Sequence, residues 1–200
     1  GWRQAAQQDL PEPTIPVPDD VKPIPFVMVA KFHLRCELDL KQVAFGLRHA
    51  EYNPRKHTSI TVRLLDPRAT ALVRASGSVA ISAKAMHPDL LKRSAKKVAR
   101  LVQKCGYEEQ ARFAGYEVTT ILAKVDLGFP VRLEHLAMKW RRNALYEPEL
   151  YSGCVFKTRK PRCTYLVTAG GKVMISGLRR MEDIEEALRL FYPVCYEFQK

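Results

Sequence analysis

Cationic side chains are the groups in this sequence with the most evident chemistry. The 200 residues carry 33 Lys and Arg against 21 Asp and Glu, a formal net charge of +12 at pH 7. Such an excess favours a polyanionic partner, and nucleic acid is the first candidate. A basic surface that only keeps the chain in solution is the alternative that charge alone leaves open.

Cysteine and histidine, the usual metal and catalytic ligands, form no recognisable pattern. The five cysteines include no C-x-x-C pair, and the five histidines show no H-E-x-x-H spacing. The G-x-S-x-G, P-loop and G-x-G-x-x-G motifs are also absent. We therefore expect a protein without catalytic activity, metal or cofactor, whose thiols are buried or incidental.

The predicted helix over residues 88–106 concentrates the cations. Its apolar side chains recur at the 3–4 spacing of one helical face, Pro88 suits the first turn, and Gly106 suits the C-terminal cap. A solvated face usually mixes charges of both signs, so a face with cations alone indicates a docking surface for an acidic partner, with simple solvation as the alternative. The cations of this face, called the basic stripe below, are Lys92, Arg93, Lys96, Lys97, Arg100 and Lys104.

The first 25 residues differ from the rest. They hold six prolines between Pro11 and Pro25, with four acids and two bases, which is typical of extended or disordered chain. We interpret residues 1–24 as a proline-rich flexible arm. The positive charge lies in residues 26–110, with 16 bases and 7 acids, and in residues 111–200, with 15 bases and 10 acids. No run approaches the roughly 18–20 apolar residues of a membrane span, so we expect no membrane partner.

The sequence repeats itself when it is shifted by 94 residues. Ten identities without a gap indicate two copies of one unit, at residues 25–110 and 111–200. The identical pairs are Tyr52/Tyr146, Pro54/Pro148, Pro67/Pro161, Arg68/Arg162, Leu72/Leu166, Val73/Val167, Gly77/Gly171, Val79/Val173, Ile81/Ile175 and Ser82/Ser176.

Each unit is predicted to fold as a helix, several strands and a second helix. In the first unit, helical spacing begins after Asp39, a suitable N-cap, and strands are expected at 59–65, 69–75 and 78–82. The closing helices are expected at 88–106 and 182–191. In the strands, Val73 alternates with Leu72 and Arg74, so helices should cover the aliphatic face. The other face is a mixed, basic surface that resembles a nucleic-acid reading face.

Several strings resemble the core of the TATA-box-binding protein family, from about Pro25 to the C-terminus. They are LDLKQVAFGLRHAEYNPRK, DPRATAL, SAKKVARLVQKCG, FPVRLE, YEPELYSG, KPR and GGKVMISG. The resemblance, to a divergent related factor of protozoan type, implies an α+β pseudo-two-fold saddle. In that fold two repeats form one curved antiparallel sheet, with helices on the convex face and DNA held by its minor groove on the concave face. It also implies a nuclear general transcription initiation factor.

The positions that give this family its sequence selectivity differ here. Family members insert two pairs of phenylalanines between base steps, which unstacks and kinks the duplex. The matching positions hold His57, Arg74, Tyr151 and Thr168, none of which is Phe. Two family asparagines that contact the central bases correspond to Val27 and Thr120, and each lost contact removes about 1–3 kcal/mol of discrimination. The resemblance therefore implies weakened TATA specificity.

Positions that hold DNA phosphates in the family remain basic here. Backbone contacts give affinity that depends on salt and little on sequence. By this resemblance the phosphate contacts are Arg63, Arg68, Lys157, Arg162 and Lys172, and the groove-floor contacts include Leu72, Ser82, Leu166 and Ser176.

The protein-binding positions of the family are also present. In the loop Y-E-P-E-L, the resemblance assigns Glu147, Glu149 and Leu150 to a TFIIB-type factor. It assigns Ala44 and Glu51 to a TFIIA-type factor, and the basic stripe to other initiation-complex subunits or regulators. A protein that nucleates preinitiation complexes on promoter DNA is thus expected. The alternative is a protein-interaction hub without productive DNA binding, which the loss of all four Phe favours and the retained cations oppose.

Overall fold

The computed structural model describes residues 7–56, 58–84 and 87–200. The chain packs as two compact units, here called the first and second repeat units. The first is Val27–Thr120, and the second joins Ile121–Lys200 to the described part of the N-terminal 26 residues. The division falls within a strand, at 120/121, whereas the sequence places the repeat boundary at 110/111, and the domain boundaries stay a prediction.

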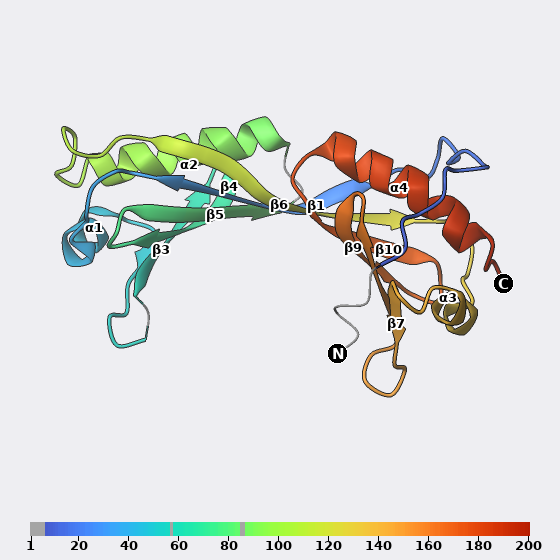
Figure 1. The fold of residues 1–200 in the computed structure, drawn as a ribbon. Helices are drawn as coiled ribbons and strands as arrows, with labels where there is room; N and C mark the ends of the chain where they lie inside the picture. Colours follow the sequence, from blue (N-terminus) through green and yellow to red (C-terminus); the bar gives the residue numbers. More distant parts are fainter. Residues whose placement is uncertain (1–6, 57, 85–86) are drawn as a thin grey trace. The chain divides into compact units, whose positions relative to one another are not determined.

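The first repeat unit is an antiparallel sheet with helices on one face (Figure 1). Its strands lie in the order β2-β3-β4-β5-β1-β6. The elements are β1 (Ile24–His33), α1 (Leu40–Gly46), β2 (Ala50–Glu51), β3 (Ser59–Leu65), β4 (Arg68–Arg74), β5 (Ser78–Lys84), α2 (Pro88–Gln103) and the start of β6 (Ala114–Asp126).

The second repeat unit has the same order of strands, β6-β10-β9-β8-β7. Its elements after β6 are α3 (Leu133–Lys139), β7 (Ala144–Tyr146), β8 (Cys154–Arg159), β9 (Arg162–Val167), β10 (Lys172–Leu178) and α4 (Met181–Tyr196). The helices and strands expected from the sequence are all present, although α2 ends three residues before Gly106 and α4 is longer than 182–191.

The repeat extends to individual backbone positions. Gly77 and Gly171 both adopt positive φ, at 84° and 89°. At each glycine an added Cβ would overlap a carbonyl oxygen, that of Cys36 in the first unit and that of Phe129 in the second. Only glycine fits both the conformation and the close approach. The repeated Gly is therefore required by equivalent turns.

Side-chain alternation separates the two faces of each sheet as predicted. In the first unit Val73 and Ile81 are fully buried, whereas Leu72 is 39% exposed. In the second unit Val173 and Ile175 are buried and Met174 is half-buried. Helix α2 contacts β3, β4 and β5, and α4 contacts β10, so the helices cover the aliphatic faces. Burial of these side chains at about 25 cal/mol per Å² drives the packing.

Helix starts are set by local capping. The Asp39 carboxylate accepts hydrogen bonds from the backbone N–H groups of Lys41 at 2.9 Å and Gln42 at 3.3 Å, as expected for an N-cap. The His87 side chain accepts from the N–H of Asp89 at 3.3 Å, and Pro88 follows in the first turn. No helix in the described residues is long and apolar enough to cross a membrane.

The described part of the proline-rich segment, residues 7–23, has no helix or strand. It lies against the second repeat unit, where Val21 is buried and Gln8 is hydrogen-bonded to Asn143. The extended conformation agrees with the sequence. The contacts were not anticipated from the sequence, and the predicted flexibility of the arm stays a prediction.

Candidate nucleic-acid interface

The helix-free sheet face of the first unit brings predicted contacts into rows across its strands. Arg63 pairs with Thr70, and Thr70 with Ser82, in one row across β3, β4 and β5. Leu72 lies in the neighbouring row, between Thr61 and Ala80. These side chains share a face because strand neighbours in register project to the same side. The result is a surface of basic, hydroxyl and aliphatic groups.

Arg63 is partly neutralised by a neighbour. Its guanidinium lies 2.6 Å from the Glu51 carboxylate, and both side chains are more than half exposed. The resemblance assigned Arg63 to DNA and Glu51 to a protein partner. The structure pairs these two residues with each other, so the ion pair competes with the partner expected for each.

The second unit has an equivalent face. Lys157 pairs with Thr164, and Thr164 with Ser176, across β8, β9 and β10. Leu166 lies between Val155 and Met174 in the next row. Arg162 and Lys172 begin β9 and β10 and are exposed, as is Arg68 at the start of β4.

The wedge positions have different structural roles. Tyr151 is 48% exposed, and its ring lies so close to Gly153 that an added Cβ there would be 2.6 Å from the ring. Arg74 is exposed at the end of β4. His57 lies outside the described residues. Tyr151 and Arg74 thus present flat groups to solvent.

The Thr168 side chain is hydrogen-bonded within a turn. Its hydroxyl accepts a hydrogen bond from the Lys172 N–H at 3.1 Å and lies 3.2 Å from the Lys172 carbonyl oxygen. These bonds close the β9–β10 connection. The side chain therefore stabilises the backbone that presents Lys172, and it offers no surface on which a base could stack.

Val27 and Thr120, at the positions of the family asparagines, are half-buried. Val27 lies opposite Lys84 in the β1–β5 pair. An amide side chain donates from its nitrogen and accepts at its oxygen, so it can contact two groups from separate atoms. Val has no polar side-chain atom, and Thr has only one, its hydroxyl oxygen.

Three further lysines lie on the helix-free faces and were missed. Lys31 is opposite Ala80, Lys84 is opposite Val27, and Lys124 is opposite Met174. Lys31 forms a 3.5 Å ion pair with Glu117, and the ammonium of Lys124 lies 5.6 Å from the Phe26 ring centre. The side-chain alternation of β1, β5 and β6 is the signal that could have found them.

The predicted protein-binding loop follows β7. Glu147 and Glu149 are exposed, and Leu150 is 81% exposed. The backbone N–H groups of Leu150 and Tyr151 both donate to the Glu147 carbonyl at 3.0 Å, which defines the turn. The loop therefore presents two carboxylates and one apolar side chain to solvent.

Ala44 is half-buried on α1, and the next residue, Phe45, is 97% exposed. Nothing within the described residues explains this exposure. Phe45 was missed from the sequence because its spacing fits neither the apolar face of the helix nor a motif.

Five of the six cations of the basic stripe are exposed on α2, and the docking role of the stripe stays a prediction. Lys97 is half-buried, and its ammonium donates a hydrogen bond to the Asp66 carbonyl in the β3–β4 turn. The remaining members are exposed: Lys92, Arg93, Lys96, Arg100 and Lys104. Position 97 lies toward the sheet side of the helix, so its ammonium stabilises the β3–β4 turn. Lys97 is therefore not part of the exposed stripe.

Three of the five thiols have the environment of core residues, and Cys36 and Cys105 are half-buried. Cys154, Cys163 and Cys195 are buried, and burial raises the pKa of Cys154 to about 11. A thiol with such a pKa stays protonated at neutral pH and is a poor nucleophile. The described residues contain no group of three or more His, Cys, Asp or Glu side chains that could hold a metal ion.

Taken together, the fold and its surfaces define a class: an α+β protein of two tandem antiparallel units, each with a basic, helix-free sheet face. Residues 27–105 and 115–198 match the family "Transcription factor TFIID (or TATA-binding protein, TBP)". The chain therefore belongs to the TATA-box-binding protein family, which confirms the expected two-repeat fold.

Relatives of the chain are found in fungi and plants. It is 38% identical to the TATA-box-binding protein of Saccharomyces cerevisiae over 173 residues, 86% of this chain and 71% of that protein. It is 38% identical to TATA-box-binding protein 2 of Arabidopsis thaliana over 184 residues, 92% of this chain and 90% of that protein. For the 37% identical Emericella nidulans protein, the match spans 63% of the relative's length and 86% of this chain.

Among solved structures, Methanococcus jannaschii TBP matches with a TM-score of 0.71 and 24% identity, covering 88% of this chain and 98% of that one. This likeness supports the fold alone. The family is one of non-enzymatic transcription factors, which confirms that the chain is not an enzyme.

Proposed function

We propose that this chain is a nuclear general transcription initiation factor that holds promoter DNA through the helix-free faces of both repeat units, with weakened TATA preference. The observation that carries the proposal is the combination of exposed cations on these faces with the loss of wedge side chains. Arg68 and Arg162 occupy identical repeat positions and are both exposed.

Affinity without strong selectivity follows from this combination. Cations that neutralise phosphates release counterions, whatever the base sequence. Selectivity in this family needs unstacked base steps and polar contacts to base edges. Thr168 is engaged in its turn, and Val27 has no polar side-chain atom, so both sources of selectivity are reduced.

The partners proposed are a TFIIB-type factor at Glu147, Glu149 and Leu150 and a TFIIA-type factor near Ala44 and Glu51. The exposed loop after β7 supports the first contact. The Arg63–Glu51 pair sets a condition on the second, because the carboxylate must leave Arg63 before it binds a partner. The stripe on α2 is proposed to bind other subunits of the initiation complex.

A second candidate function is a protein hub that does not engage DNA productively. The specific observation in its favour is that three of the four wedge positions are Arg74, Tyr151 and Thr168, and Thr168 is occupied by a turn. The hub and the DNA-binding proposal predict opposite results with naked DNA.

The proposal is tested with the full chain on a TATA duplex and on a duplex of the same length with scrambled sequence. We expect binding to both, with affinities within about tenfold, that is about 1.4 kcal/mol. Sequence-specific DNA-binding proteins typically bind their own site roughly 10³–10⁷ times more tightly than other DNA. A sharp preference for TATA would contradict weakened specificity, and the absence of binding to either duplex would favour the hub.

The TFIIB-type contact has a separate test. A Glu147→Arg, Glu149→Arg double variant should lose association with a TFIIB-type factor while retaining DNA affinity. Retained association with that factor would contradict the assignment of the loop.

A further inference from the structure

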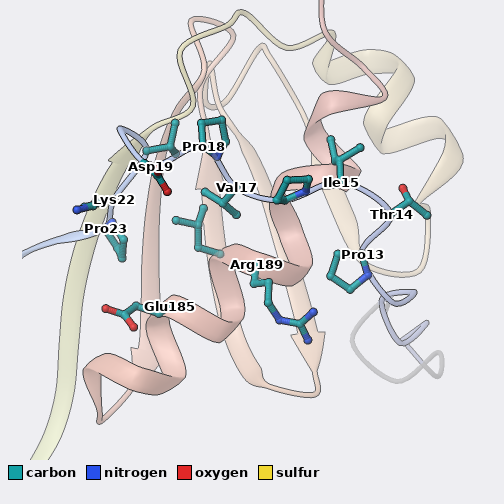
Figure 2. A pocket seen from close by; sticks show the side chains of 13 residues that line it. Pro13, Thr14, Ile15, Val17, Pro18, Asp19, Lys22, Pro23, Glu185 and Arg189 are labelled. Atoms are coloured by element: carbon teal, nitrogen blue, oxygen red, sulfur yellow. The ribbon is translucent and has the colours of Figure 1, made fainter.

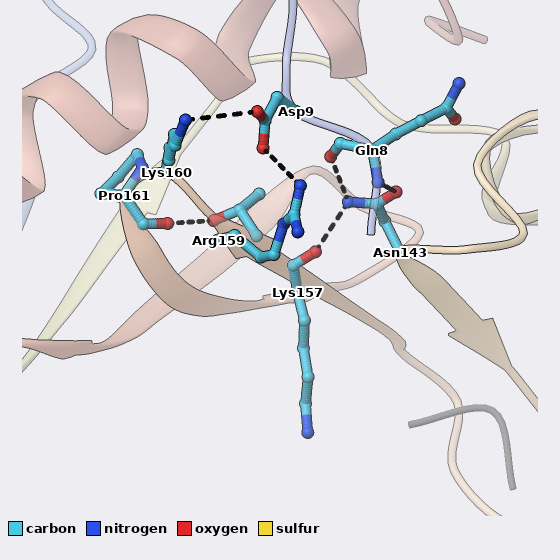
Figure 3. A network of polar contacts seen from close by, with 8 residues as sticks. Gln8, Asp9, Asn143, Lys157, Arg159, Lys160 and Pro161 are labelled. Carbon is cyan, nitrogen blue, oxygen red and sulfur yellow. Dashed lines mark hydrogen bonds and ion pairs between the residues drawn. The ribbon is translucent and has the colours of Figure 1, made fainter. Parts of the chain in front are cut away.

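The surface beneath the proline-rich arm is built to hold a peptide main chain. Asn143 is 0% exposed, and its side-chain oxygen accepts from the Gln8 N–H at 3.1 Å. Its side-chain nitrogen donates to the carbonyls of Gln8 and Lys157, both at 2.9 Å (Figure 3). Two of these three bonds go to the backbone of a single arm residue, so Asn143 recognises an extended chain irrespective of its side chains.

Cations beside Asn143 select acidic residues of the arm. Asp9 lies between Arg159 and Lys160 of the β8–β9 turn, at 3.7 Å and 3.8 Å (Figure 3). Further along, Glu12 lies 3.7 Å from Arg189 of α4. Ion pairs of this length on an exposed surface each contribute little to stability. The carboxylates of the arm can therefore be replaced by carboxylates of another segment.

The rest of the arm is seated less completely. From Pro13 to Pro18 half-buried and exposed residues alternate, and Ile15 and Val17 turn toward the protein. An open surface pocket of about 810 Å³ is lined by this stretch and by Glu185, Leu188 and Arg189 of α4 (Figure 2). The arm therefore leaves part of the surface around it open to solvent.

We propose that this surface, the arm seat of Asn143, Arg159, Lys160, Leu188 and Arg189, is a docking site for an extended acidic segment of a partner protein. The arm occupies the seat in the free chain and shows which chemistry fits it: an extended backbone with carboxylates facing three cations. A partner segment with closer packing against α4 displaces the arm. The proposal does not depend on DNA binding.

A fluorescent synthetic peptide of residues 7–23 is the probe, with the full chain as receptor. A tethered arm competes at a high effective concentration, so the wild type should bind the peptide weakly. An Asp9→Lys, Glu12→Lys variant repels its own arm from the seat and should bind the peptide at least tenfold more tightly. The matched control is Asp19→Lys, Asp20→Lys, which makes the same charge change in the arm at residues with no ion pair given by the described structure, and it should bind like the wild type.

Three results would overturn the proposal. The peptide fails to bind the Asp9→Lys, Glu12→Lys variant, although its melting temperature equals that of the wild type. The peptide binds that variant and the wild type equally. Sedimentation velocity shows a concentration-dependent dimer of the wild type that the same variant loses, in which case the occupant is the arm of a second copy. Loss of peptide binding on adding Arg159→Glu and Lys160→Glu is the result expected if the seat is correct.

Discussion

Helices α2 and α4 close equivalent repeats, yet their outer faces differ. The exposed face of α2 carries Lys96 and Arg100, whereas α4 exposes Glu182, Glu185 and Glu186. Their inner faces are alike, with Val98 and Val102 buried in α2 as Ile184 and Leu188 are in α4. The comparison teaches that packing has kept one fold in both units, while charge has diverged where packing places no demand.

The outer face of α4 also forms ion pairs with other residues of the chain. Arg189 pairs with Glu186 at 2.7 Å and with Glu12 of the arm at 3.7 Å, and hydrogen bonding from Arg189 lowers the pKa of Glu186. Along α2, Lys96 and Arg100 are exposed, whereas Lys97 donates to the Asp66 carbonyl.

The largest effect is expected for Gly171→Ala. The Cβ would meet the Phe129 carbonyl oxygen at a positive φ, so strain and steric overlap add, and we expect a loss of about 3 kcal/mol in the free energy of unfolding or failure to fold. Gly77→Ala should behave similarly in the first unit. Gly128→Ala, at φ 83° with open space around it, should cost only about 1–2 kcal/mol. Denaturant titration compares the three variants, and equal losses at Gly171 and Gly128 would contradict the steric overlap at Gly171.

Next is Asn143→Leu, which leaves three buried bonds of the arm seat unmade. We expect a loss of about 1–3 kcal/mol in unfolding free energy and faster amide exchange at Gln8. The control is His49→Leu. His49 is exposed, and its carbonyl accepts from Arg63 at 3.0 Å as that of Asn143 does from Lys157 at 2.9 Å. That control should cost less than about 0.5 kcal/mol, and unchanged exchange at Gln8 in Asn143→Leu would count against the seat.

A smaller effect is expected for Lys97→Ala. The variant loses the hydrogen bond to the Asp66 carbonyl, so it should be destabilised by about 1 kcal/mol. Lys96→Ala, one residue earlier on the exposed stripe, should stay within about 0.5 kcal/mol of the wild type. Thermal unfolding distinguishes the two variants. Identical melting temperatures would indicate that Lys97, like Lys96, has no structural role and belongs to the exposed stripe.

The smallest effect concerns Glu51→Gln. The change releases Arg63 from its ion pair, so affinity for scrambled DNA should rise and the slope of log K against log salt should steepen by up to about 1. Fluorescence anisotropy measures both. Position 51 corresponds to Leu145 in the second unit, so the sequence repeat does not carry this carboxylate. A variant that binds DNA more weakly would show that Glu51 positions Arg63 for DNA.

The fold was predictable because it rests on patterns that are local or repeated. Alternation at Val73 and Leu72, the cap at Asp39 and the repeated Gly77 and Gly171 each follow from short-range rules. The alternation of β1 also carries the signal for Lys31, which lies on the same face as Val27.

The rest could not be predicted for physical reasons. The Gln8–Asn143 bonds join residues 135 positions apart, and they involve the main chain of one partner, which leaves no trace in its residue type. Lys97 reads as one of six equivalent cations until the turn at Asp66 is placed beside it. Likewise the turn role of Thr168 depends on its distance to Lys172, which no periodicity specifies.

The salt dependence of DNA binding tests the central claim most directly, namely that cations of the sheet faces, and not those of α2, hold DNA. For the full chain, log K should fall steeply and linearly with log salt, with similar slopes on TATA and scrambled duplexes. Arg68→Ala, Arg162→Ala should reduce the slope by roughly 2, whereas Arg100→Ala, Lys104→Ala, with the same loss of charge, should leave it unchanged. No measurable binding, or equal slopes for the two double variants, would contradict the account.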